Sequence, residues 1–91
     1  MINSFPDKRV ATIKDYDFDF TSFIGVETIA SVTITISPTG LTEATSHIIN
    51  AGIVKIFLRD GVVGETYTIT VVITTSGGRV EELSPTMRVI A

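Results

Sequence analysis

The chain has 91 residues and a formal net charge of −3 at pH 7, with no cysteine, no tryptophan and one histidine, His47. This length suits a single domain with its own core, and the absence of cysteine excludes disulfides, thiolate metal sites and cysteine nucleophiles. The seven lysines and arginines are scattered, and no apolar run is long enough to span a membrane, so we expect neither a nucleic-acid partner nor a membrane partner.

The composition favours strands over helices. Valine, isoleucine and threonine make up 37 of the 91 residues, whereas leucine and alanine together make up eight. Side chains branched at Cβ fit pleated, half-buried surfaces. We therefore expect an all-β protein. The polar, proline-containing residues 1–9 lack the pattern of a signal peptide and are predicted to be an N-terminal arm, with the domain proper over residues 10–91.

Alternating residues predict the first two long strands. After a short lead-in strand over residues 10–14, three aromatic residues alternate with three aspartates, which predicts an inward aromatic face: Tyr16, Phe18 and Phe20. The next strand is predicted over residues 28–37. Its expected inward face consists of Ala30, Val32, Ile34 and Ile36. A proline and a glycine, Pro38 and Gly40, end this strand.

The second half of the chain continues the pattern. A weak strand is expected within residues 41–49, and a stronger one over residues 53–59. The clearest strand is predicted over residues 65–75, and a tight turn at 76–78 leads to a last strand that is offset near Pro85. About seven strands in this order predict an immunoglobulin-like antiparallel β-sandwich.

Two of these strands carry no ionised side chain, namely residues 32–37 and 66–75. An uncharged strand at an exposed sheet edge is an aggregation hazard. We therefore expect both to lie inside a sheet, or one of them to be covered by another subunit.

The acidic residues do not predict a metal site or a catalytic pair. Alternate strand residues such as Asp15, Asp17 and Asp19 lie nearly 7 Å apart, which is too far for three carboxylates to share one calcium ion. The adjacent Glu81 and Glu82 point to opposite faces of a strand. We interpret the three aspartates as a solvated strand face.

Neither the histidine nor the glycine-rich stretches predict a metal-binding or phosphate-binding site. His47 has no second histidine or cysteine with which to share a metal. The glycine-rich stretches at 61–64 and 76–78 precede no helix, so they cannot form a phosphate-binding helix N-terminus. We predict no catalytic, cofactor-binding or metal-binding residue, and a protein that is not an enzyme.

A more specific pattern is Gly64-Glu65-Thr66-Tyr67, in which a turn glycine precedes a tyrosine at the start of a strong strand. This spacing is typical of the tyrosine corner of immunoglobulin-like sandwiches, in which the hydroxyl bonds to backbone upstream. The alternative is an ordinary core tyrosine. We predict a structural tyrosine corner at Gly64 and Tyr67.

Several fragments in fixed order carry a family resemblance. They are Asp15-Tyr16-x-x-Asp19-Phe20, Ile24-Gly25-x-x-Thr28-Ile29-x-Ser31, Pro38-x-Gly40-Leu41, Gly61-x-x-Gly64-x-x-Tyr67 and Ile73-Thr74-Thr75-x-x-Gly78-Arg79. Over residues 15–89 the chain resembles small Ig-like structural proteins encoded among the virion genes of tailed bacteriophages, which are associated with fibres, capsid decoration or the head–tail junction.

The resemblance implies a non-enzymatic virion protein without a cofactor, assembled in the cytoplasm of the bacterial host. Its partner would be a capsid, neck or tail protein, and it is a possible homo-oligomer. The alternative is a carbohydrate- or cell-surface-binding module. That function would require exposed aromatic residues, for which Phe5, Phe23 and Phe57 are the candidates.

Apolar residues on the expected outward faces indicate a protein-binding surface. Phe57, Val72, Ile29 and Ile90 all fall opposite the inward sets of their strands, among threonines rather than charges. We expect Phe5 in the N-terminal arm to contact the same partner. We predict a protein interface at Phe5, Phe57, Val72 and Ile90.

Overall fold

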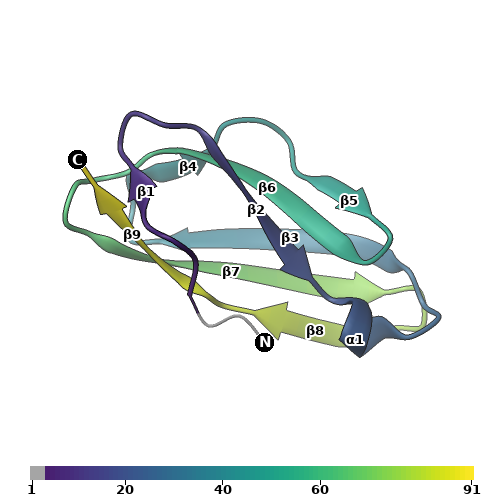
Figure 1. The fold of residues 1–91 in the computed structure, drawn as a ribbon. Coiled ribbons are helices and arrows are strands. Elements are labelled where there is room, and N and C mark those ends of the chain that lie inside the picture. The colour runs from purple at the N-terminus through teal and green to yellow at the C-terminus, as the bar shows by residue number, and fades with distance from the viewer. Residues whose placement is uncertain (1–3) are drawn as a thin grey trace.

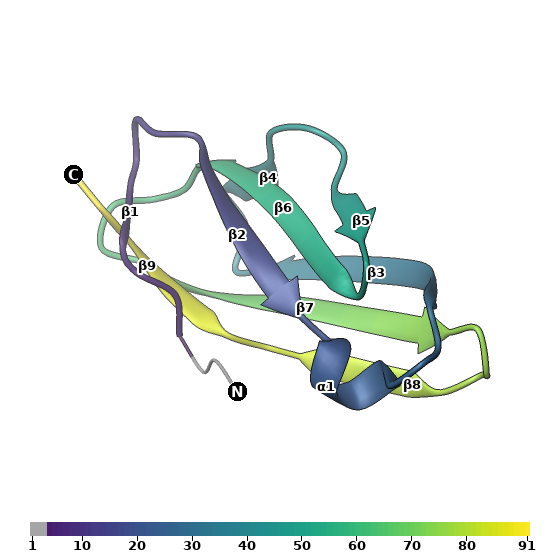
Figure 2. The ribbon, with the colours of Figure 1, turned by 45° about the vertical axis from the view of Figure 1, so that its right-hand side comes forward.

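Two β-sheets pack face to face in the computed structural model, which describes residues 4–91 (Figure 1). The molecule is elongated, with principal extents of 42 × 22 × 18 Å. Viewed from a second direction, the strands β2 and β6 lie in one layer and the strands β7 and β9 in the other (Figure 2).

The first sheet has the order β1 (Lys8–Arg9), β9 (Thr86–Ile90), β7 (Thr66–Thr75) and β3 (Ile29–Ser37), with β8 (Val80–Leu83) also paired to β7. The second sheet has the order β2 (Lys14–Asp19), β6 (Ile53–Asp60) and β4 (Leu41–Glu43), with β5 (Ile48–Asn50) also paired to β6. One short helix, α1 (Thr21–Ile24), follows β2. No helix among residues 4–91 has the length and hydropathy needed to cross a bilayer.

The prediction of an all-β sandwich is confirmed. Within residues 4–91 the nine strands occupy seven positions, because β4 and β5 both pair with β6, and β8 and β9 both pair with β7. The break between β8 and β9 falls at Ser84 and Pro85, where the last strand was predicted to be offset. The pairing is not wholly antiparallel, however, since β1 runs parallel to β9.

The core consists of the residues that alternate on the facing sides of the two sheets. In β7 the inward residues are completely buried: Tyr67, Ile69, Val71 and Ile73. Opposite them lie Val54, Ile56 and Leu58 of β6 and the aromatic residues Tyr16, Phe18 and Phe20. The period-2 pattern of the sequence therefore identifies this core, because successive strand side chains point to opposite faces.

A β-bulge changes the start of β3. Its register with β7 shifts between Ile29 and Ser31. As a result Ala30 is exposed, although it was predicted to face inward, and Ile29 packs against the core, although it was predicted to face outward. An inserted residue reverses the alternation on one side of the bulge, and a simple period-2 pattern does not reveal it.

The two uncharged strands differ in their positions. The expectation that both lie inside a sheet holds for β7, which is flanked by β3 on one side and by β8 and β9 on the other. It does not hold for β3, which within the described residues pairs only with β7 and forms the edge of the sheet. The alternative, that another subunit covers this strand, stays a prediction.

The alternating burial of β7 leads to a stability prediction. Ile69→Ala removes a fully buried side chain and leaves a cavity, which we expect to lower the free energy of unfolding by about 2–5 kcal/mol. Thr68→Ala, at the exposed neighbouring position, should lower it by about 1 kcal/mol or less. Urea unfolding of both variants checks the difference, and equal losses would show that both faces of β7 are buried.

Candidate functional site

The hydroxyl of Tyr67 joins two turns at one end of the sandwich. It accepts a hydrogen bond from the backbone N–H of Val62 at 2.9 Å and donates one to the carbonyl of Thr39 at 3.2 Å. The side chain is completely buried. Both bonds reach upstream backbone, which is the kind of contact that the Gly64–Tyr67 spacing predicts.

Glycines make room for this contact. Gly40 adopts a φ of 116°, and a Cβ atom there would lie 2.9 Å from the Tyr67 hydroxyl oxygen. Gly64 has a φ of 90° in open surroundings, so its role is conformational rather than steric. The sequence pattern connected Gly64 with Tyr67 but did not connect Gly40 with it. Gly40 lies in a different turn and contacts Tyr67 only in the folded chain.

Lys8 is completely buried, although it belongs to the segment predicted to be an arm. Its Nζ donates hydrogen bonds to the carbonyls of Arg9 and Asp60, both at 2.9 Å. Burial lowers the pKa of the Lys8 ammonium group, and the negative charge of Asp60 partly offsets this effect. Lys8 thus connects β1 to the last residue of β6.

Phe5 lies against the core aromatic residues rather than on an open surface. Its ring centroid is 4.6 Å from that of Tyr16 and 5.1 Å from that of Phe18, with an edge-on arrangement in the second pair. Its backbone N–H donates to the carbonyl of Thr86 at 2.8 Å. The described part of the N-terminal segment therefore packs along the border between β2 and β9.

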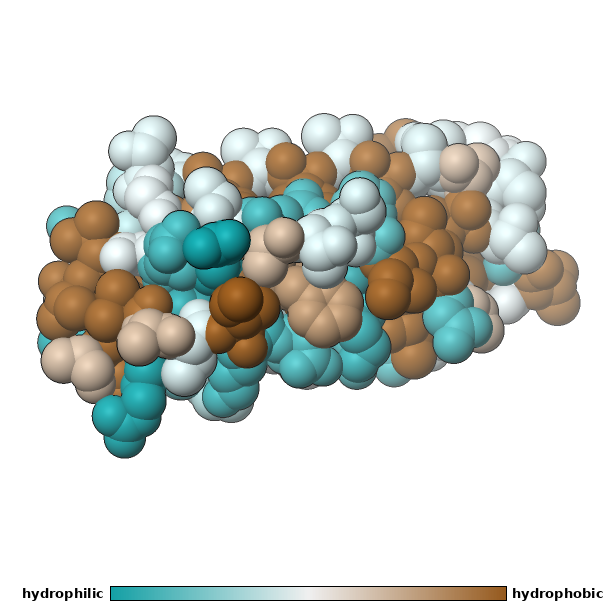
Figure 3. Space-filling view, turned by 90° about the horizontal axis from the view of Figure 1, so that it is seen from above, coloured by the Kyte–Doolittle hydropathy of each residue, from teal (hydrophilic) through white to brown (hydrophobic). Residues whose placement is uncertain are grey.

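The other residues of the predicted interface lie on separate surfaces. Phe57 faces outward from the second sheet, whereas Val72 and Ile90 face outward from the first, and all three are half-buried. By strand spacing Ile90 and Val72 are about 26 Å apart along β7. In the view from above, apolar residues occur in groups separated by polar ones (Figure 3). The structure does not bring the four predicted residues onto one face.

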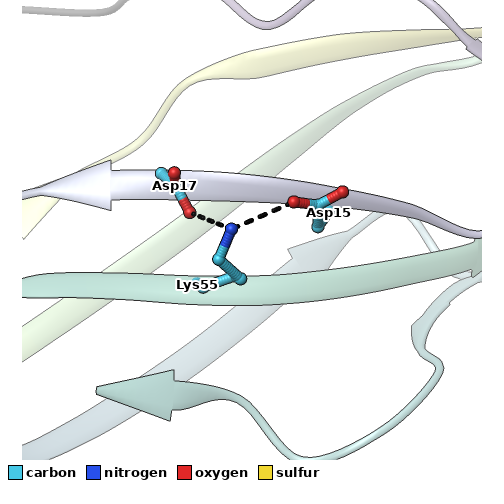
Figure 4. A network of polar contacts seen from close by, with 3 residues as sticks. All are labelled: Asp15, Asp17 and Lys55. Atoms are coloured by element: carbon cyan, nitrogen blue, oxygen red, sulfur yellow. Dashed lines mark hydrogen bonds and ion pairs between the residues drawn. The ribbon is translucent and has the colours of Figure 1, made fainter. Parts of the chain in front are cut away.

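The aspartates of β2 share a lysine on the neighbouring strand. The Lys55 Nζ lies 3.1 Å from Asp15 Oδ2 and 3.2 Å from Asp17 Oδ1 (Figure 4). The hydrogen bond from Lys55 lowers the pKa of the Asp15 carboxyl group, and these contacts raise the pKa of Lys55. Asp19 instead accepts hydrogen bonds from the backbone N–H and the hydroxyl of Thr21, which lower the pKa of its carboxyl group.

Two hollows open between the sheets. The larger, about 440 Å³, lies between β2, α1 and the break between β8 and β9, and its lining combines three phenylalanines with two aspartates: Phe5, Phe18, Phe23, Asp17 and Asp19. The smaller, about 240 Å³, lies where β3 and β5 meet α1.

The single histidine, His47, lies in the loop between β4 and β5. Its Nδ1 atom is 3.5 Å from Oε2 of Glu43, the last residue of β4. Within residues 4–91 no group of three potential metal ligands converges.

We expect Tyr67→Phe to lower the free energy of unfolding by about 1–2 kcal/mol, because the Val62 N–H and the Thr39 carbonyl lose the hydroxyl that they share in a buried part of the structure. Tyr16→Phe is the matched control, since among residues 4–91 the Tyr16 hydroxyl makes one long hydrogen bond, of 3.4 Å, to the carbonyl of Pro6. Chemical denaturation near neutral pH measures both. A Tyr67→Phe loss no larger than that of the control would contradict the structural role of the hydroxyl.

Tyr16 also predicts how stability depends on alkaline pH. Burial, followed by the charges of Asp7 and Asp15, raises its pKa from 10.0 to about 12. Between pH 10 and 12 the unfolded chain loses the phenolic proton while the folded chain keeps it, so stability falls as pH rises through this range. The free energy of unfolding of Tyr16→Phe should fall less steeply there than that of the wild type. Parallel slopes would contradict the raised pKa.

Comparison with known protein families assigns this chain to a family. No curated protein matches the chain. A family model does match residues 8–88, from β1 into β9, and it describes the podophage GP4 fiber-tail adaptor protein gp77. Because the match covers most of the chain, the protein belongs to this family of tailed-phage virion structural proteins.

Proposed function

We propose that the protein is a non-enzymatic, immunoglobulin-like module that binds a tail protein of a podophage virion and acts as an adaptor between fibre and tail. The observation that carries this proposal is the family match over residues 8–88, which includes strands from both sheets. Among the capsid, neck and tail partners that the sequence resemblance implies, the match favours the tail.

The strand order supports the immunoglobulin-like part of the proposal. The sheet β9-β7-β3 corresponds to strands G, F and C of an immunoglobulin sandwich, and β2-β6-β4 corresponds to strands B, E and D. Tyr67 lies at the start of the strand equivalent to F and bonds to upstream backbone. These contacts support the assignment of a tyrosine corner at Gly64 and Tyr67.

The side-chain chemistry is consistent with a binding role. The carboxylates of Asp15 and Asp17 are paired with Lys55 on an exposed face. The three phenylalanines that a carbohydrate-binding surface would require, Phe5, Phe23 and Phe57, are all half-buried. The family match, which describes a fiber-tail adaptor, gives a protein-binding role more support than the carbohydrate-binding alternative.

Virion incorporation tests the adaptor proposal. A tagged copy of the chain is supplied during infection by a phage that lacks its own copy, and the particles are separated into tails and tailless heads. We expect the tagged chain in the tail fraction, together with restored fibre attachment. Recovery with the heads, or fibre attachment that does not depend on the chain, would overturn the proposal.

Opposite faces can be distinguished in the same assay. Phe57→Asp and Val72→Asp place one charge on each outer face of the sandwich. If one of these faces contacts the tail, one variant should fail to incorporate and the other should serve as its control, provided that both melt cooperatively. Normal incorporation of both folded variants would contradict the prediction of an interface at these residues.

A further inference from the structure

One border of the sandwich ends in an unpaired strand. Within residues 4–91, β3 pairs only with β7. In an antiparallel pair, every second residue directs its N–H and C=O groups away from its neighbour, so the outer side of β3 presents unpaired backbone donors and acceptors.

The exposed edge has none of the usual protections against strand pairing. From Ser31 to Ser37 the register with β7 is regular, and this stretch contains no charged residue and no proline. The bulge lies before this stretch, and Pro38 follows it. Edge strands that remain unpaired in solution are typically short, bulged or charged.

The opposite border of the molecule is protected in this way. Its edge strands β1, β2 and β8 carry seven charged residues that are exposed or half-buried: Arg9, Lys14, Asp15, Asp17, Asp19, Glu81 and Glu82. The same chain therefore has one charged border and one border whose long edge strand is uncharged.

Apolar side chains accompany the uncharged edge. Ile48 and Ile49 of β5 are 50% and 44% exposed. Ile49 and Ile29 of β3 line the same hollow, which places β5 at the same border as β3. Glu43, the one acidic residue of β4 and β5, lies against His47.

We propose that the outer edge of β3 pairs antiparallel with β3 of a second copy of this chain, forming a two-fold symmetric dimer with a continuous sheet. A neutral edge matches itself without like-charge repulsion, and a two-fold axis permits antiparallel pairing of identical strands. The outward side chains would form cross-strand hydroxyl pairs, drawn from Ser31, Thr33, Thr35 and Ser37. This inference goes beyond the proposed function and does not depend on it.

Light scattering after size-exclusion chromatography tests the dimer. The wild type should have twice the monomer mass of 9.8 kDa, and the double variant Thr33→Lys/Thr35→Lys should be monomeric, because it places lysines opposite one another across the seam. The matched control, Thr66→Lys/Thr68→Lys, carries the same charges on the same face of an interior strand and should remain dimeric. Thermal melts establish that each variant is folded.

Charge complementation makes the test specific for β3. Thr33→Glu/Thr35→Glu should also be monomeric alone, but an equimolar mixture with the lysine variant should form a heterodimer. A wild type that stays monomeric up to about 1 mM, at which even weak association is detected, would overturn the proposal. A dimeric lysine variant, a monomeric control or a mixture that fails to associate would overturn it as well.

Discussion

A single hydroxyl group holds together the two places where the chain passes between the sheets at one end of the sandwich. The chain leaves the first sheet after β3 through the turn that contains Thr39, and it returns after β6 through the turn that contains Val62. Tyr67 bonds to both turns from the start of β7, the strand that also provides the centre of the core. The hydroxyl thus fixes both connections between the sheets relative to β7. It lies so close to residue 40 that a side chain has no room there, which explains the glycine at this position.

The core was predictable from the sequence because burial in a two-layer sandwich follows an alternation that each strand carries by itself. Tyr16, Phe18 and Phe20, and likewise the inward residues of β7, are buried as their spacing predicts. Properties that depend on a partner strand were not predictable in the same way. The bulge at Ala30 and the edge position of β3 are set by pairing with β7, and the burial of Lys8 depends on a carbonyl 52 residues away in the chain. The predicted interface stays a prediction, and its geometry was not predictable, because alternation assigns Phe57 and Val72 to outward faces without saying that these are two different faces.

The two borders of the sandwich differ in the charge of their edge strands. At the border of β1, β2 and β8 most exposed side chains are charged, and Lys55 pairs with Asp15 and Asp17 on the adjoining face. Such side chains keep sheet edges from pairing at random and cost little stability, because exposed ion pairs contribute weakly. The border of β3 instead contains alternating hydroxyl and apolar side chains. The contrast between a charged border and a neutral one is what the proposed pairing through β3 requires, because only the neutral edge can pair with itself without like-charge repulsion.

Pairing through an edge and binding through a face make different demands on a small virion protein. Pairing through β3 draws mainly on backbone groups and leaves the outer faces, which carry Phe57 and Val72, free for other proteins. An adaptor must contact more than one protein, and a 91-residue sandwich has little surface to divide between them. The proposed use of the edge for self-association and of a face for the tail would resolve this limit, because a dimer doubles the number of faces without enlarging the chain. In such a dimer the two-fold axis would present identical faces in opposite strand directions, so that both copies could engage equivalent sites on a repeating partner.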